Sequence, residues 1–394
     1  MQGRSSIFEF MEIESLVRLA AGIGQEVASK EALVADANGT WVEETMRALQ
    51  ESKLTGLVVP AAFGGLDHGL LSLVRISEEL GKSYSSAGLC FGMHCVGTAI
   101  IASKATQWQQ QNYLVPIAEG RHITTLALSE TGTGAHFYFP QTALIAVTED
   151  EFIVSGTKSF VTNGGHADSY VTSTLGASAD AEQEEFSCVI IDKSAPGIEW
   201  GQPWAGLGMR GNSSRLMNIN DVHISGNHVL GEKGDQLWYV FNVVAPYFLM
   251  AMAGTYLGIA ESALSEAKET LLKRHYAHSG GSLSNVSLLQ HRLGTIWAKV
   301  ERTRRLVYHA AEMGDKKPQE AMISLLSAKA EVANCCVDVV NEVMTLAGGI
   351  GYQSNSHLGL LLRDARASHV MSPTTDLLYT WIGRVLLDQP VLSD

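Results

Sequence analysis

The chain contains, near its C-terminal end, Gly348-Gly349-Ile350-Gly351-Tyr352, then Leu362-Arg363-Asp364-Ala365-Arg366, then Ser372-Pro373-Thr374-Thr375-Asp376. Glycine allows a helix to end with a positive φ, so the first motif predicts a helix that runs into a turn. Proline pushes the preceding residue out of the helical region but suits the first turn of a new helix. We therefore expect a helix with Ser372 as N-cap and Pro373 as its first residue. The whole stretch predicts a junction of helix ends.

Composition indicates a soluble enzyme with a large core. The chain has 394 residues, of which 46% are apolar and 18% charged, enough for two or three packed units. The net charge is −13, from 28 basic and 41 acidic residues, and no basic cluster stands out. This balance argues against a nucleic-acid partner.

The cysteines favour a reducing, cytoplasmic location. There are five, an odd number without metal-ligand spacing: Cys90, Cys95, Cys188, Cys335 and Cys336. The charge-free run Gln236–Ala260 is long enough to cross a membrane. Because it contains Asn242 and Pro246, we expect instead a helix at the centre of an all-helical domain, and no membrane contact.

The periodicity of apolar residues divides the chain into three parts. Residues 1–120 and 236–394 show helical spacing, whereas 121–235 hold short β-rich runs separated by turn signals. The expected strands cover 123–128, 143–147, 152–156, 169–174 and 186–191. The fold class is therefore mostly α with a central β-domain, a small barrel or sandwich, between an N-terminal helical domain and a C-terminal four-helix bundle.

Several motifs resemble the acyl-CoA dehydrogenase family of flavoproteins. They are Leu128-Ser129-Glu130-Thr131-Gly132-Thr133-Gly134, Gly156-Thr157-Lys158-Ser159-Phe160-Val161-Thr162-Asn163-Gly164, Gly206-Leu207-Gly208-Met209-Arg210-Gly211 and the C-terminal motifs quoted above. Each is weak alone, but they occur in order, at family spacing, over nearly the whole chain. The resemblance implies the same order of helical, β and four-helix domains, with FAD as cofactor.

The resemblance also assigns flavin contacts. It places Leu126, Leu128 and Ser129 at the isoalloxazine ring, Phe160 where a tryptophan usually packs on it, and Thr162 at its edge. It places Arg274 at the pyrophosphate, Gly348 and Gly349 at the dinucleotide from a neighbouring subunit, and Thr374 and Asp376 after the catalytic position. It further implies a homotetramer or homodimer.

Each assignment has a structural alternative. Ser129 can satisfy backbone groups at a strand edge, Arg274 can be solvated, and Thr162-Asn163-Gly164 can form a plain hairpin turn. Arg363, Asp364 and Arg366 are expected to form structural ion pairs rather than to carry chemistry.

The chain departs from the family at its catalytic base. The family places a glutamate where Ser372 stands, or on the long helix at a position that falls near Phe248. No acidic residue lies between Gln236 and Ala260, and Thr345 replaces a glutamine common before the Gly-Gly turn. Losing a general base costs a factor of about 10²–10⁴. This is therefore a divergent member without the usual glutamate, and Ser372 is not expected to be a base.

Three hypotheses remain. The first is α,β-dehydrogenation of an acyl thioester, on coenzyme A or a carrier protein, with a relocated base: His369, Asp376 or His136. The second is a flavin-dependent monooxygenase that hydroxylates carbon or nitrogen with oxygen. The third is a non-catalytic flavin-binding member. An electron-transfer flavoprotein or a flavin reductase is the expected redox partner.

Overall fold

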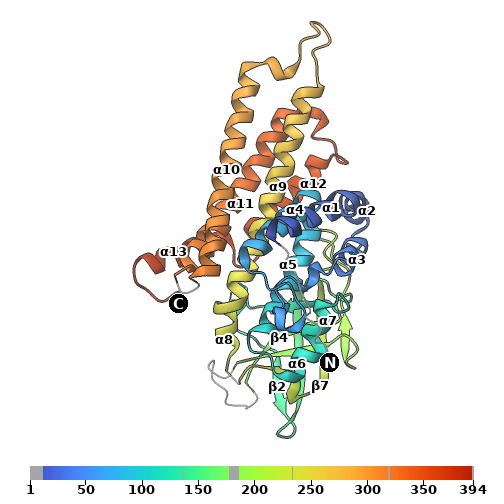
Figure 1. Ribbon diagram of the computed structural model, residues 1–394, viewed down its shortest axis with the longest axis vertical. Coiled ribbons are helices and arrows are strands. Elements are labelled where there is room, and N and C mark those ends of the chain that lie inside the picture. Colours follow the sequence, from blue (N-terminus) through green and yellow to red (C-terminus); the bar gives the residue numbers. More distant parts are fainter. Residues whose placement is uncertain (1–11, 135, 177–185, 233, 318–319, 393–394) are drawn as a thin grey trace, which may run out of the picture.

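Helices form the first part of the fold in the computed structural model, which describes residues 12–134, 136–176, 186–232, 234–317 and 320–392. They are α1 (Ile13–Ile23), α2 (Ser29–Asn38), α3 (Glu43–Glu51), α4 (Leu70–Ser83), α5 (Ser85–Ser103), α6 (Gln107–Gln109) and α7 (Val115–Ala118). They lie between the strand region and the long helices in Figure 1. The polar loop expected over Asp180–Glu185 lies outside the described residues.

The middle part consists of two four-stranded sheets. The first has the order β1 (Thr124–Ala127), β4 (Ser169–Thr174), β5 (Ser187–Asp192), β8 (Val229–Leu230), and the second β2 (Ala143–Ala146), β3 (Glu151–Val161), β7 (Arg215–Ser225), β6 (Ile198–Trp200). The β1–β4 pair is parallel, with Leu126 opposite Val171, and the others are antiparallel. The predicted helix–strand–helix order is confirmed, while the boundaries at 120 and 235 stay predictions.

The turn after β3 differs from the hairpin considered for Thr162-Asn163-Gly164. Asn163 has a φ of 60°, and Gly164 N–H donates to Val161 O, so a tight turn is present. However, β3 pairs with β7, whereas the next strand, β4, belongs to the other sheet. The turn therefore carries the chain from one sheet to the other, because β4 pairs with β1 rather than with β3.

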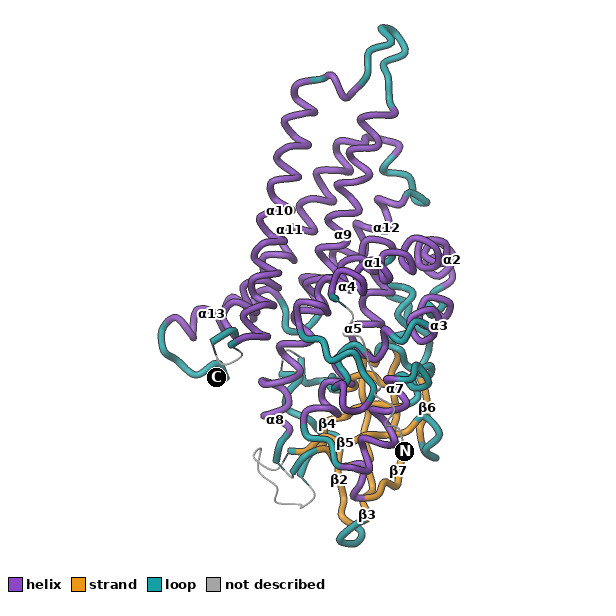
Figure 2. The backbone as a smooth tube through the Cα atoms, in the orientation of Figure 1, coloured by secondary structure: helices purple, strands orange, loops and turns teal. Residues whose placement is uncertain are grey.

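Helices form the last part of the fold, and Figure 2 shows the longest of them extending away from the strands. They are α8 (Gln236–Tyr239), α9 (Ala245–Lys273), α10 (Ser287–Lys316), α11 (Met322–Ala347), α12 (His357–Val370) and α13 (Thr375–Leu386). Single π-helical turns occur at Gly24–Ala28, Gln110–Leu114 and Val240–Val244.

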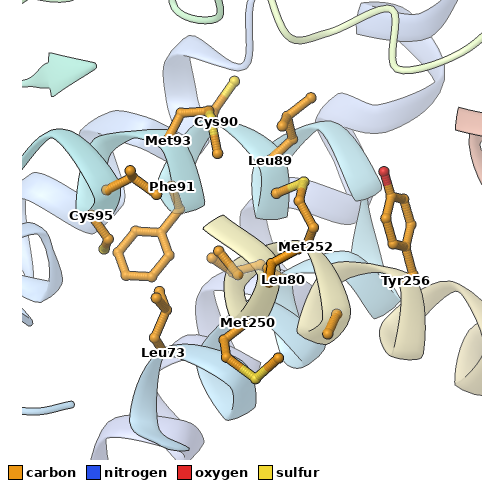
Figure 3. Close-up of a cluster of buried hydrophobic side chains, with 14 of the residues drawn as sticks. Leu73, Leu80, Leu89, Cys90, Phe91, Met93, Cys95, Met250, Met252 and Tyr256 are labelled. Carbon is orange, nitrogen blue, oxygen red and sulfur yellow. The ribbon is translucent and has the colours of Figure 1, made fainter. Parts of the chain in front are cut away.

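The core lies where α4, α5 and α9 cross. A Cβ atom on Gly254 of α9 would lie 2.3 Å from the Val74 carbonyl oxygen of α4, so only glycine permits this approach. Figure 3 shows the buried side chains around it, including Leu73, Leu80, Leu89, Phe91, Met250 and Met252.

Among the described residues, two helical stretches are long and apolar enough to span a membrane, Ser85–Ser103 and Gln236–Lys273. Their most apolar windows are 94% and 78% buried inside the fold. This burial agrees with the central helix expected over Gln236–Ala260.

Candidate active site

The residues expected at the flavin ring meet where the two sheets adjoin. β1 continues into Leu128 and Ser129, and β3 carries Ser159 and Phe160. The Ser159 N–H donates to the Ser129 carbonyl oxygen across 2.8 Å. Leu128 is buried, while Leu126 and Ser129 are half-buried. Two segments 30 residues apart are thus held together where the sheets adjoin. We call this contact between residues 128–129 and 159–160 the seam.

Lys158 fixes this seam from inside. Its fully buried ammonium contacts the Glu130 carboxylate and donates to the Leu128 carbonyl at 3.4 Å and the Ser173 carbonyl at 2.7 Å. Burial lowers the pKa of Lys158 to about 8, although the Glu130 charge opposes this shift. Sequence reasoning missed this role, because a lysine between polar strand residues is usually solvated.

Phe160 presents an aromatic ring outward from the seam. Its φ is 55°, and 66% of the residue is exposed. The Trp204 ring lies edge-on at 6.0 Å between centroids. A left-handed conformation costs a residue with a Cβ about 1–2 kcal/mol, and such strain is characteristic of functional positions. An exposed ring held at this cost fits a residue that packs on a planar cofactor.

Thr162 lies just beyond the ring of Phe160 along the chain and is 5% exposed. Its hydroxyl is 3.2 Å from the Ser214 hydroxyl, and its carbonyl accepts from Thr125 Oγ1 at 3.0 Å. A hydroxyl can donate one hydrogen bond and still accept another. The structure therefore leaves Thr162 able to take a flavin contact, and that role stays a prediction.

The predicted pyrophosphate residues lie at a second location. Arg274 follows α9 and donates to the Ala347 carbonyl oxygen, at the end of α11, across 2.8 Å. A Cβ on Gly348 or Gly349 would meet nothing within 4 Å, and Gly348 has a φ of 67°. A cavity of about 700 Å³ opens here, lined by residues that include Glu266, Arg274, Ala347, Gly351, Gln353 and His357.

These two groups lie at opposite ends of the molecule. α9 runs from the strand region to the far end of the bundle, where Arg274 follows it (Figure 1). Ser129, Phe160 and Thr162 belong to the strand region. The exposed ring of Phe160 belongs to the strand region, whereas the exposed guanidinium of Arg274 and the open space at Gly349 belong to the helical bundle, and both groups have features that suit a dinucleotide. Thr345 is exposed and donates to Asn341 of its own helix.

The junction between α12 and α13 corrects one expectation. Thr374, not Ser372, is the N-cap of α13, and its hydroxyl accepts from Leu377 N–H at 3.4 Å. Ser372 is half-buried before a buried Pro373, and the peptide bond between them is cis. The cap is displaced by two residues because Thr374 itself has the extended conformation of an N-cap, and its hydroxyl reaches the Leu377 N–H of the helix.

The candidate bases differ in their surroundings. His369 is half-buried near the end of α12, and burial, then the charges of Arg366 and Lys329, lowers its pKa. Asp376 is exposed in the first turn of α13. His136 is exposed in the loop after β1, against the rings of Tyr138 and Phe139. Of these three candidates, only His369 thus combines partial burial with a position three residues before Ser372 in the sequence.

The buried carboxylates of the described residues already have structural partners. Asp364, fully buried, accepts hydrogen bonds from Ser85 Oγ and from Met209 N–H, and burial raises its pKa to about 6. Glu78 pairs with Arg304 at 3.0 Å. The Arg363 guanidinium pairs with Asp36 at 2.6 Å, as expected for a structural ion pair, whereas Arg366 is exposed. Phe248, at the alternative base position, is half-buried on α9.

Models of three acyl-CoA dehydrogenase domains match the chain in order. The N-terminal domain matches residues 12–121, the middle domain 125–222 and the C-terminal domain 246–387.

Individual proteins agree with the domain models. An acyl-CoA dehydrogenase of Bacillus subtilis is 26% identical over 348 residues, which cover 87% of this chain and 89% of that protein. A short-chain-specific acyl-CoA dehydrogenase of Clostridium acetobutylicum is 28% identical and covers 85% and 87%. The structure of butyryl-CoA dehydrogenase from Megasphaera elsdenii superposes with a TM-score of 0.89 at 23% identity, over 96% of this chain and 98% of that one. The chain belongs to the acyl-CoA dehydrogenase family, whose cofactor is FAD.

Proposed function

We propose that the protein is an FAD-dependent dehydrogenase that introduces a double bond between the α- and β-carbons of an acyl thioester. The observation that carries the proposal is the seam at which Ser129, Ser159 and Phe160 meet, in a chain that matches all three domains of the family. The relatives named above are dehydrogenases, which does not favour the monooxygenase or the non-catalytic alternative.

The reaction removes a proton from the α-carbon and a hydride from the β-carbon. When bound, FAD supplies the two-electron acceptor for the hydride. Phe160 and the segment Leu126–Ser129 would hold the ring, and Arg274 with Gly348 and Gly349 would hold the phosphates. A side chain of the protein must accept the α-proton. Ser372, at the family's base position, has no carboxylate, so another residue must do so.

We propose His369 as the group that takes this proton. A base must be unprotonated before it accepts a proton, and a lowered pKa keeps the His369 imidazole in its unprotonated, neutral form at pH 7. Asp376 is exposed, so its carboxyl group faces water. Asn in place of His369 removes the basic nitrogen and retains most of the shape.

The proposal also covers the oligomeric state, the substrates and the redox partner. Because the two halves of the cofactor site lie at opposite ends of a chain, we propose that two chains share each FAD within a homodimer or homotetramer. Thioesters of coenzyme A are the proposed substrates, with a carrier protein as the alternative carrier, and an electron-transfer flavoprotein as the acceptor. The buried free thiols support a reducing, cytoplasmic location.

The proposal is tested on the purified protein loaded with FAD. Under anaerobic conditions, butyryl-CoA and longer acyl-CoA thioesters are added, and bleaching of the flavin absorbance is followed. Bleaching that yields the enoyl thioester is expected; bound FAD that no acyl thioester bleaches would contradict the proposal. The His369→Asn and Asp376→Asn variants then test the base, with a fall of about 10²–10⁴-fold expected for His369→Asn. If both variants keep the full rate, neither residue is the base.

A further inference from the structure

Lys329 is a fully buried lysine at the junction that carries Ser372. It lies on α11 and is 0% exposed. Its ammonium donates to the Ser368 carbonyl oxygen at 2.8 Å and to the Pro373 carbonyl oxygen at 3.0 Å. These two carbonyls stand on either side of Ser372 in sequence.

The Ser368 carbonyl belongs to the last turn of α12, where carbonyl groups have no partner within the helix. Pro373 directly precedes Thr374, the N-cap of α13. Lys329 therefore satisfies a buried group at the end of one helix and another at the start of the next. Its ammonium links the two ends of the segment between these helices, and we call this pair of hydrogen bonds the brace.

A second side chain holds the same segment. The hydroxyl of Tyr256, fully buried on α9, donates to the Met371 sulfur at 3.0 Å. Ser368, Met371 and Pro373 are thus tied to two different helices of the bundle. The half-buried Ser372 has a fixed residue on either side of it.

Burial of the Lys329 ammonium costs free energy of solvation. Its hydrogen bonds go to carbonyl oxygens and not to a carboxylate, so no opposite charge offsets this cost. Burial alone lowers the pKa of Lys329 to about 8, whereas the other fully buried lysine, Lys158, has the Glu130 carboxylate beside it. The Lys329 ammonium is thus held by two backbone carbonyl groups, so its hydrogen bonds act on the path of the chain at the junction.

We propose that Lys329 is a positioning residue that holds the segment Ser368–Pro373 so that Ser372 and His369 keep their places against the substrate; its catalytic part rests on the proposed function. His369 lies inside the braced segment. Displacing a proton acceptor by about 1 Å can cost a factor of about 10² in rate, because proton transfer requires close contact. The brace therefore contributes to kcat rather than to substrate affinity.

The first test is independent of turnover. Hydrogen–deuterium exchange is measured over residues 368–376 in FAD-loaded wild type, Lys329→Met and Lys329→Gln. Methionine leaves both carbonyls without a donor, so exchange at these amides should be at least about tenfold faster. Glutamine retains N–H donors on a shorter side chain and should show a smaller increase. Lys104→Met is the matched control, since Lys104 pairs with Asp235 at 2.8 Å and not with the junction.

The second test separates positioning from simple stability. Stopped-flow bleaching by butyryl-CoA should be about 10–100-fold slower in Lys329→Met, with the thioester Kd within about threefold of wild type, because only the reacting geometry is lost. Lys329→Gln should recover part of the rate, and Lys104→Met should keep all of it. Where Lys329→Met does not fold, Lys329→Gln serves for both measurements.

Three results are decisive. Unchanged exchange in both Lys329 variants overturns the brace. Faster exchange with an unchanged bleaching rate overturns the positioning role. If butyryl-CoA and longer thioesters fail to bleach the wild type, the proposed function fails, and the exchange measurement alone still decides whether Lys329 holds the segment.

Discussion

The Ser159 N–H donates to the Ser129 carbonyl oxygen across 2.8 Å, and this bond joins strand ends that belong to different sheets. The peptide that follows Ser159 turns into the left-handed conformation of Phe160 and directs its ring outward. The seam thus couples the position of the predicted ring contact to the contact between the segment that follows β1 and strand β3. The effect of substitutions at the seam should therefore be measured on FAD binding as well as on activity.

Replacing Phe160 by alanine should weaken FAD binding. Removal of an aromatic stacking partner costs about 0.5–1.5 kcal/mol, which corresponds to a Kd about two- to tenfold higher. Isothermal titration of the apoprotein with FAD measures the change. Ile145→Ala, which removes another exposed apolar side chain in the strand region, is the control and should bind FAD as wild type does.

Arg274→Met should weaken FAD binding more strongly, by about 10–100-fold, because a charge-assisted hydrogen bond contributes about 1.5–3 kcal/mol. Arg305→Met removes an arginine that is 83% exposed in its side chain and should leave the affinity unchanged. Equal affinities for all three proteins would show that Arg274 does not contact the cofactor.

Ser372→Glu should restore the family's carboxylate and accelerate bleaching by butyryl-CoA. A correctly placed general base contributes a factor of about 10²–10⁴, and His369 already supplies part of it, so a gain of about tenfold to 10²-fold is expected. Ser372→Gln has the same shape without the charge and should show no gain. The idea that this position still faces the α-proton is wrong if the two variants react at the same rate.

Asp364 should make stability depend on pH. Burial raises its pKa in the folded protein from 3.8 to about 6, so the folded state binds the proton more tightly than the unfolded state. The resulting stabilisation is fully present below pH 3.8 and is lost as pH rises through 6, by at most about 3 kcal/mol.

Denaturant unfolding of wild type and Asp364→Asn between pH 4 and 8 checks this window. The wild type should lose stability relative to the variant as pH rises, since asparagine cannot ionise. A difference in unfolding free energy that is constant over the range would mean that Asp364 does not titrate there.

Sequence patterns predicted the elements that depend on local periodicity. The run at 169–174 matches β4 at both ends, and the helical spacing after Ala321 matches α11. The short strands β6 and β8, of three and two residues, were missed because they form only by pairing with β7 and β5. Motif spacing located the seam residues. It could not predict that the chain passes from one sheet to the other after Asn163, because this depends on which strand β4 pairs with.

Tertiary partners account for the remaining differences. Ser372 and Thr374 both carry a hydroxyl before a helix, and only the path of the backbone decided that Thr374 caps α13. Lys158 and Lys329 look like ordinary polar residues in sequence, because nothing in the periodicity indicates that their ammonium groups bind buried carbonyls. A lysine within an apolar helical run, as at Lys329, is the one local signal that could have been followed.

The distance between the Phe160 region and Arg274 also has a genetic consequence. If each FAD is held by the strand region of one chain and the bundle end of another, damage to one region leaves the other intact. A mixed oligomer of Phe160→Ala and Arg274→Met chains would then contain some sites with both defects and some with neither. Two alleles that each disable one of these regions should therefore complement each other when expressed together.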